Sequence, residues 1–188
     1  EEIAQALQTL DPSHLLAGRG ALRACPGLVT IFTPESVYLP VANQVQSIMV
    51  HPWQPGRPFE DSFTAVLFGP GLAAPNLPGD FRGELVHLWW ECPLPVIADA
   101  SGLDWVPPNP KPSKGIRVLT PHPGEAARLL KISAEAVQKD RPKAVREISR
   151  SYGNSWVVLK GHQTVIGRST GELFVNSSGN PYLAQGGS

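Results

Sequence analysis

Length and charge point to a single globular domain and exclude several classes of protein. The chain has 188 residues, with 16 basic and 16 acidic side chains. At a formal charge of zero, strong attraction to nucleic acid or to an anionic membrane is not expected. Its apolar runs are far shorter than the roughly 20 residues that a membrane-spanning helix needs. Two cysteines cannot form a disulfide framework, and the sequence opens without a basic and then apolar leader, so we expect a cytoplasmic protein.

Apolar runs alternate with segments of helical spacing along the chain. Strands that alternate with helices form βαβ units, so this order predicts a mostly parallel sheet. The expected helices are 1–10, 15–24, 81–90, 125–130 and 142–152, and the expected strands are 28–33, 47–50, 64–68, 95–98, 116–119 and 155–159.

Near the end of the chain the spacing changes. Three short apolar runs, 156–159, 164–166 and 173–175, are separated by single glycines, which predicts an antiparallel meander at the sheet edge. The predicted fold class is α/β, with three layers around a mostly parallel sheet and an antiparallel edge hairpin. With no internal repeat or linker, residues 1–188 are expected to form a single domain. Charged residues make up only 17% of the chain, which favours a homo-oligomer.

The residues after each predicted strand form the candidate site, because ligands of such sheets bind at the carboxyl ends of the strands. Gly69 and Gly71 follow the strand 64–68 in the run Gly69-Pro70-Gly71-Leu72. Glycine lets the backbone approach a ligand closely. These glycines are therefore candidates for a binding turn, although an ordinary tight turn explains the same run.

His122 is the candidate side chain after the strand 116–119. It stands between Pro121 and Pro123 and precedes a predicted helix, whose first turn suits Pro123 and Glu125. The two prolines hold the imidazole at the strand end, where it could donate a hydrogen bond to a substrate. A purely structural histidine is the alternative.

Lys160 follows the strand 155–159 and begins the turn 160–164. A lysine beside a glycine at a strand end can neutralise a phosphate as a point charge, and the amides of the turn add donors. A solvated hairpin turn explains the same residues. Further along, the runs 178–181 and 186–188 are rich in glycine and predict a flexible segment.

Several familiar motifs are absent from the sequence. The five histidines have no metal-ligand spacing with one another or with Cys25 and Cys92, so the residues by themselves predict no metal site. There is no P-loop, no zinc-protease helix and no Gly-x-Ser-x-Gly nucleophile. The run Gly18-Arg19-Gly20 is not a dinucleotide fingerprint, because no strand precedes it.

In their order along the chain, these strand-end motifs resemble one family, the ADP- or ATP-dependent NAD(P)H-hydrate dehydratases of the ribokinase-like fold. The most specific match is Thr120-Pro121-His122-Pro123-Gly124-Glu125. The run 69–72 resembles the family's Gly-Pro-Gly-Leu-Gly turn, and the run 99–104 resembles its Asp-Ala-Asp-Gly-Leu-Asn segment. The resemblance extends from Leu15 to Ser188.

The resemblance implies an activity and a set of binding residues. The protein would use ADP or ATP, with Mg²⁺ bridging the phosphates, to phosphorylate the ring hydroxyl of hydrated NADH or NADPH. Elimination of phosphate would then restore NAD(P)H. Hydrated dinucleotide would bind at Gly69, Gly71 and His122. The nucleotide would be held by Lys160, Gly161, His162, Gln163, Thr164, Asn180, Gly186, Gly187 and Ser188.

Two departures from the family pattern lead to a further expectation. The catalytic aspartate of the family follows its Gly-Gly-Ser run, which places it beyond Ser188, and the glycine-rich turn before its first helix is not found between His14 and Leu15. We expect a longer natural chain, with segments at both places and with an epimerase domain or partner. A ribokinase-fold kinase that does not eliminate phosphate, and a catalytically silent nucleotide-binding module, stay open as alternatives.

Overall fold

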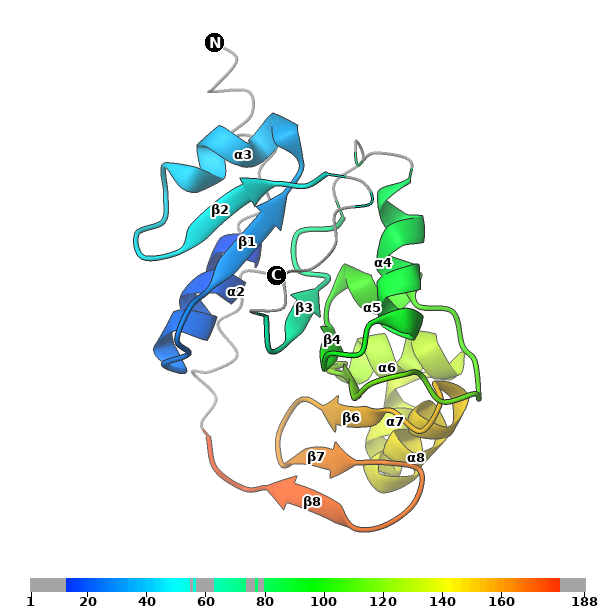
Figure 1. The fold of residues 1–188 in the computed structure, drawn as a ribbon. Helices are drawn as coiled ribbons and strands as arrows, with labels where there is room; N and C mark the ends of the chain where they lie inside the picture. The colour runs from blue at the N-terminus through cyan, green and yellow to red at the C-terminus, as the bar shows by residue number, and fades with distance from the viewer. Residues whose placement is uncertain (1–12, 55, 57–62, 74–76, 78–79, 180–188) are drawn as a thin grey trace.

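The computed structural model describes residues 13–54, 56, 63–73, 77 and 80–179 (Figure 1). Helices and strands alternate along these residues, as the sequence predicts. In chain order the elements are α2 (Ser13–Arg23), β1 (Thr30–Thr33), α3 (Glu35–Ala42), β2 (Met49–Pro52), β3 (Val66–Phe68), α4 (Phe81–Glu91), β4 (Val96–Ala98), α5 (Ser101–Trp105), β5 (Arg117–Leu119), α6 (Pro123–Leu130), α7 (Ala134–Lys139), α8 (Arg141–Ser151), β6 (Trp156–Leu159), β7 (Thr164–Gly167) and β8 (Leu173–Asn176).

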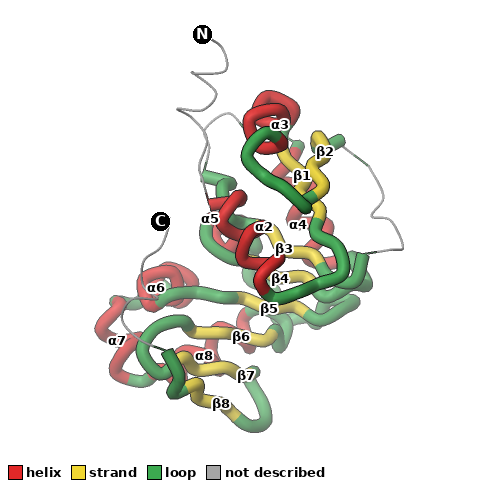
Figure 2. The backbone as a smooth tube through the Cα atoms, turned by 90° about the vertical axis from the view of Figure 1, so that its left-hand side faces the viewer, coloured by secondary structure: helices red, strands yellow, loops and turns green. Residues whose placement is uncertain are grey.

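Six of these strands form one mixed sheet in the order β3-β4-β5-β6-β7-β8 (Figure 2). The pairs from β3 to β6 are parallel, and β6, β7 and β8 form an antiparallel meander. This confirms the predicted α/β class and its antiparallel edge. The first two strands, β1 and β2, pair in parallel as a separate sheet, which the sequence did not predict.

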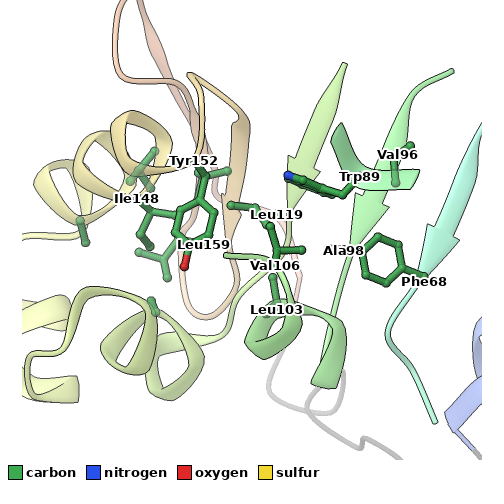
Figure 3. Close-up of a cluster of buried hydrophobic side chains, with 14 of the residues drawn as sticks. Phe68, Trp89, Val96, Ala98, Leu103, Val106, Leu119, Ile148, Tyr152 and Leu159 are labelled. Atoms are coloured by element: carbon green, nitrogen blue, oxygen red, sulfur yellow. The ribbon is translucent and has the colours of Figure 1, made fainter. Parts of the chain in front are cut away.

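The core lies on one face of the large sheet, against helices α4, α5, α6 and α8. Strands that follow one another in order are joined by right-handed crossovers in nearly all proteins, which places the connecting helices on the same face. The buried strand residues alternate along each strand, and Figure 3 shows several of them beside side chains of the helices. The buried hydrophobic residues of these strands are Phe68, Val96, Ala98, Leu119, Val157, Leu159 and Val165.

The helix boundaries follow from local chemistry. Helix α8 begins after Asp140, whose carboxylate accepts a hydrogen bond from the Lys143 N–H at 3.0 Å and so caps the helix. Asp80 is the residue before α4, but its side chain makes no capping hydrogen bond. Within the described residues, no helix is long and apolar enough to cross a membrane.

Three short helices were missed by the sequence patterns: α3, α5 and α7. Helix α3 contains Pro40 and is mostly apolar, so its spacing shows no amphipathic face. Helices α5 and α7 have five and six residues, too few for a periodicity to emerge. The helix predicted over 1–10 lies outside the described residues. Helix α2 runs through residues 14 and 15, and the segment expected there in a longer chain stays a prediction.

Candidate active site

The carboxyl ends of the parallel strands β3 to β6 meet at one edge of the large sheet. Backbone hydrogen bonds between neighbouring segments of the chain continue past the ends of the strands at this edge. They run from the N–H of Asp99 to the carbonyl of Phe68 (3.1 Å), from Thr120 to Ala98 (3.2 Å) and from Lys160 to Pro121 (2.8 Å). The motifs singled out in the sequence therefore begin on one continuous backbone ladder.

Gly69 contacts the backbone of Asp99 directly. Its φ is +125°, and a Cβ at this position would lie 1.7 Å from the Asp99 carbonyl oxygen. A side chain is thus excluded by backbone conformation and by space. The close approach that the sequence predicted at Gly69 is made here by the neighbouring strand end, and its contact with a ligand stays a prediction.

The turn after Gly69 also requires its second glycine. The Leu72 N–H donates to the Gly69 carbonyl at 3.1 Å, and Gly71, third in the turn, has φ +81°. With Pro70 in the second place, this is the pattern of a type II turn. The run 69–72 therefore has the conformation of a tight turn at the sheet edge. This is the conformation that the alternative explanation drawn from the sequence assumed.

Asp99 and Lys160 form an ion pair across this edge, from the ends of β4 and β6. The Lys160 Nζ lies 2.6 Å from Asp99 Oδ1. Partial burial acts to raise the pKa of Asp99, but the hydrogen bond and charge of Lys160, with help from Thr120 and the Ala100 N–H, outweigh it and hold the pKa below its usual value. Asp99 is therefore a carboxylate at neutral pH.

Glu125 is a second carboxylate beside Lys160 and is almost fully buried. Its Oε2 lies 3.9 Å from Lys160 Nζ, and the same oxygen accepts the N–H of His122 at 2.7 Å. In return, His122 Nδ1 accepts the N–H of Glu125 at 3.4 Å and that of Gly124 at 3.0 Å. This reciprocal arrangement is a capping box at the start of α6.

The capping box determines how the imidazole of His122 is presented. Because Nδ1 accepts hydrogen bonds, the neutral ring carries its proton on Nε2. That Nε2 is 3.5 Å from Glu125 Oε1, and the side chain is 53% exposed. His122 thus has a structural role as the N-cap of α6, and its half-exposed imidazole also lies at the strand end.

The turn after β6 holds the other predicted residues. Gly161 has φ +128° and Gln163 has φ +54°, and the Thr164 Oγ1 donates to the Gly161 carbonyl at 3.0 Å. Gly161, His162 and Gln163 are exposed. The backbone of this turn is therefore open to solvent beside Lys160, which suits the proposed contact with a nucleotide.

Arg141, the first residue of α8, donates hydrogen bonds to the backbone where the same turn begins. Its Nη2 donates to the carbonyls of Leu159 at 2.8 Å and Lys160 at 3.3 Å, and its Nη1 donates to Gln138 Oε1 at 2.7 Å. A Cβ on Gly161 would lie 3.4 Å from Nη1. Burial lowers the pKa of the guanidinium, which stays charged because its ordinary value is far above neutrality.

The structure thus brings Gly69, His122 and Lys160 into one cluster, joined through two residues that the sequence did not assign to the site. Asp99 and Glu125 were part of the motifs named in the sequence. The sequence around a carboxylate at a strand end does not indicate which lysine it will contact in the fold. Arg141 was missed because its contacts are with backbone 18 and 19 residues away. The predicted residues Asn180, Gly186, Gly187 and Ser188 lie outside the described residues.

The family profile of NAD(P)H-hydrate dehydratases matches residues 9–188. The chain belongs to this family. It is 35% identical over 176 residues to the bifunctional NAD(P)H-hydrate repair enzyme Nnr of Coxiella burnetii, an overlap of 92% of this chain and 35% of that protein. It is 32% identical over 180 residues to the ADP-dependent (S)-NAD(P)H-hydrate dehydratase of Bacillus subtilis, covering 92% of this chain and 62% of that one.

Solved structures agree with this family membership. The ADP/ATP-dependent NAD(P)H-hydrate dehydratase of Bacillus subtilis, co-crystallised with ATP and Mg²⁺, superimposes with a TM-score of 0.78 at 31% identity, over 95% of this chain and 63% of that one. A ribokinase-like superfamily protein of Enterococcus faecalis, 24% identical, has a TM-score of 0.66 over 93% of this chain and 61% of that one, which shows the ribokinase-like fold. The chain spans about a third of the bifunctional relative and less than two thirds of the dehydratases.

Proposed function

We propose that this family member catalyses the ADP- or ATP-dependent dehydration of hydrated NADH or NADPH. The observation that carries the proposal is the contact network at the sheet edge, in which Asp99 touches the Gly69 turn and Lys160, while Glu125 joins Lys160 to His122. Segments that resemble the family's motifs are far apart in sequence, and here they meet as one site. In the proposed reaction a phosphoryl group passes to the ring hydroxyl, and phosphate then leaves to restore the ring double bond.

Hydrated dinucleotide would bind beside Gly71 and His122. The His122 side chain is 53% exposed, and because Nδ1 accepts hydrogen bonds within the capping box, Nε2 is the nitrogen that can donate to a ligand. An imidazole N–H can orient a hydroxyl or carbonyl group of a ligand. We assign His122 to substrate binding and not to proton transfer, because its Nδ1 is already occupied within the helix start.

ADP or ATP would bind along the turn from Lys160 to Thr164. The ammonium of Lys160 has three N–H donors, and the contact with Asp99 Oδ1 uses one of them. The remaining donors and the exposed backbone of the turn suit phosphate oxygens. In phosphoryl transfer such groups act by positioning the phosphates and balancing their charge.

The described residues are compatible with Mg²⁺ carried in by the nucleotide. Among them no cluster of three or more His, Cys, Asp or Glu side chains could hold a metal ion. Mg²⁺ often takes only one or two carboxylates and completes its shell with phosphate oxygens and water. The carboxylates of Asp99 and Glu125 beside Lys160 are such oxygen donors. When bound, the ion would neutralise phosphate charge.

Asp99 does not fit the role of general base. A carboxylate with a lowered pKa that is paired with a lysine is a poor proton acceptor. The aspartate implied by the family resemblance follows residue 188 and stays a prediction. A homo-oligomer, a cytoplasmic location and an epimerase domain or partner likewise stay predictions.

The test is an assay with hydrated NADH, ADP or ATP, and Mg²⁺. The expected result is release of free phosphate together with the return of reduced-nicotinamide absorbance in equal amounts. Accumulation of a phosphorylated dinucleotide without phosphate release would identify a kinase instead. Nucleotide binding without turnover would favour the catalytically silent module.

A further inference from the structure

The positive charge of Lys160 is offset by two nearby carboxylates at the proposed nucleotide turn. Its ammonium lies 2.6 Å from one carboxylate oxygen of Asp99 and 3.9 Å from one of Glu125. One lysine and two carboxylates give this group a net charge of −1. A phosphate brought to the turn would meet a cation that is already more than neutralised, so a further cation of the protein nearby would add to the positive charge that Mg²⁺ brings with the nucleotide.

Among the residues that the structure describes, Arg141 has no acidic partner at this turn. Across the described part of the chain, no carboxylate lies within ion-pair distance of its guanidinium, whose contacts are two backbone carbonyls and the Gln138 amide oxygen. Its Nε is buried and has no hydrogen-bond partner there. Because its partners are neutral groups, no carboxylate offsets the positive charge of Arg141. The formal charges of Asp99, Glu125, Lys160 and Arg141 together sum to zero.

The geometry couples this charge to the shape of the turn. Arg141 binds the carbonyls of Leu159 and Lys160 from the start of α8, and its guanidinium lies beside Gly161, where a Cβ would be 3.4 Å from Nη1, an ordinary van der Waals contact. A planar guanidinium can hold two carbonyls at once, which an ammonium does less well. Arg141 therefore fixes the backbone at the point where the turn leaves β6.

We propose that Arg141 is a positioning residue of the nucleotide site, which holds the Lys160–Gly161 backbone in place and supplies the positive charge that Lys160, paired with Asp99, does not. This inference rests on the proposed function for the identity of the ligand, ADP or ATP. It concerns a residue outside the strand-end motifs.

Helix α8 provides a matched control. Arg146 lies on the same helix and donates to the carbonyls of Arg168 (3.5 Å), Ser169 (3.3 Å) and Gly171 (3.0 Å), in the turn between β7 and β8. It makes the same kind of contact with a different turn. Loss of Arg146 removes a similar set of hydrogen bonds without touching the Lys160 turn.

The experiment measures ADP and ATP binding by calorimetry for the full chain and the variants Arg141→Gln, Arg141→Lys and Arg146→Gln, each checked by thermal melting. We expect Arg141→Gln to weaken binding by about 10- to 100-fold and to reduce its salt dependence. Arg141→Lys should recover part of the loss, and Arg146→Gln should stay within about twofold of wild type. In turnover, Arg141→Gln should raise KM for the nucleotide and leave KM for the hydrated dinucleotide unchanged.

Wild-type affinity in a folded Arg141→Gln would overturn the inference, and so would an equal loss in Arg146→Gln. Should Arg141→Gln fail to fold, an Arg141→Lys variant that binds nucleotide as wild type does, at both salt concentrations, would overturn the charge-and-geometry role. A wild-type chain that binds nucleotide but does not dehydrate its substrate would refute the proposed reaction alone. A wild-type chain that binds neither nucleotide would refute both.

Discussion

Two cations, at opposite ends of the large sheet, are held in different ways. Arg117, at the start of β5, is 2% exposed and donates to four backbone carbonyls: those of Trp89, Cys92, Leu94 and Ile116. Lys160, after the end of β6, is half exposed and paired with a carboxylate. Four of the five guanidinium N–H groups of Arg117 are thus in use, whereas the ammonium of Lys160 keeps donors for a ligand.

The difference separates a structural cation, Arg117, from the cation that we propose for nucleotide binding, Lys160. Arg117 ties the loop after α4 to the sheet, and its ring contact with Trp89, 5.8 Å from Cζ to centroid, adds to this closure. Burial lowers the pKa of its guanidinium. Changes at Arg117 should therefore affect folding, and changes around Lys160 should affect binding and turnover.

The largest expected effect follows Gly69→Ala. The new methyl group would collide with the Asp99 carbonyl at a backbone conformation that alanine disfavours, so we expect a loss of about 3–5 kcal/mol in unfolding free energy. Activity should fall with it, because Asp99 holds Lys160. Gly83→Ala is the control, since α4 leaves open space there and helix propensity should give a gain of about 0.5–1 kcal/mol. Urea unfolding of both variants checks this, and equal stabilities would contradict the packing described.

Next in size is Arg117→Met. Removal of the guanidinium takes the Arg117 donors away from the carbonyls of Trp89, Cys92 and Leu94, which should cost about 3 kcal/mol of stability. In the folded fraction, kcat and nucleotide affinity should match wild type within about twofold. Thermal melting and steady-state kinetics measure the two quantities, with the exposed Arg150→Met as control. A large loss of affinity at unchanged stability would reverse the assignment of the two cations.

Asp99→Asn should show the opposite pattern. Its amide keeps the shape of the carboxylate but not the charge, so Lys160 loses its anchor. We expect kcat/KM to fall by about tenfold or more, about 1.4 kcal/mol in transition-state binding, with a stability change near 1 kcal/mol or less. A double-mutant cycle with Lys160→Met isolates the pair, and additive losses would show that the two side chains act independently. Asp104→Asn, which breaks the exposed pair with Arg128 on α5 and α6, is the control.

The smallest effect is a pH dependence of stability. Because the folded-state pKa of Asp99 is lowered below its ordinary value of 3.8, its contribution is present above that value and is lost as pH falls through the folded pKa. The stability difference between wild type and Asp99→Asn should therefore shrink in acid, below about pH 4. Chemical unfolding between neutral and acidic pH measures it. A difference that grows in acid would mean that the carboxylate is not stabilised by Lys160.

The sequence predicted the sheet well because its strands are short apolar runs between turn residues. Even the turn 69–72 and the start of α6 were placed correctly, since proline and glycine act locally. The site's connections could not be predicted in the same way. That Asp99 meets Lys160, 61 residues further on, depends on the strand order, and the contacts of Arg141 with the Leu159 and Lys160 carbonyls depend on the packing of α8 against β6. The separate sheet of β1 and β2 was missed for the same reason, because local patterns carry no pairing information.

The hydrogen-bonded ladder that continues from the strands into the site has a dynamic consequence. The N–H groups of Asp99, Thr120 and Lys160 donate hydrogen bonds to neighbouring segments of the sheet. Their amide hydrogens should therefore exchange with solvent only when the sheet itself opens. The exposed amides of 161–163 should exchange far sooner. Within the described residues, a ligand would meet a scaffold whose backbone is already ordered, and the entropy lost on binding would come mainly from side chains and the one exposed turn.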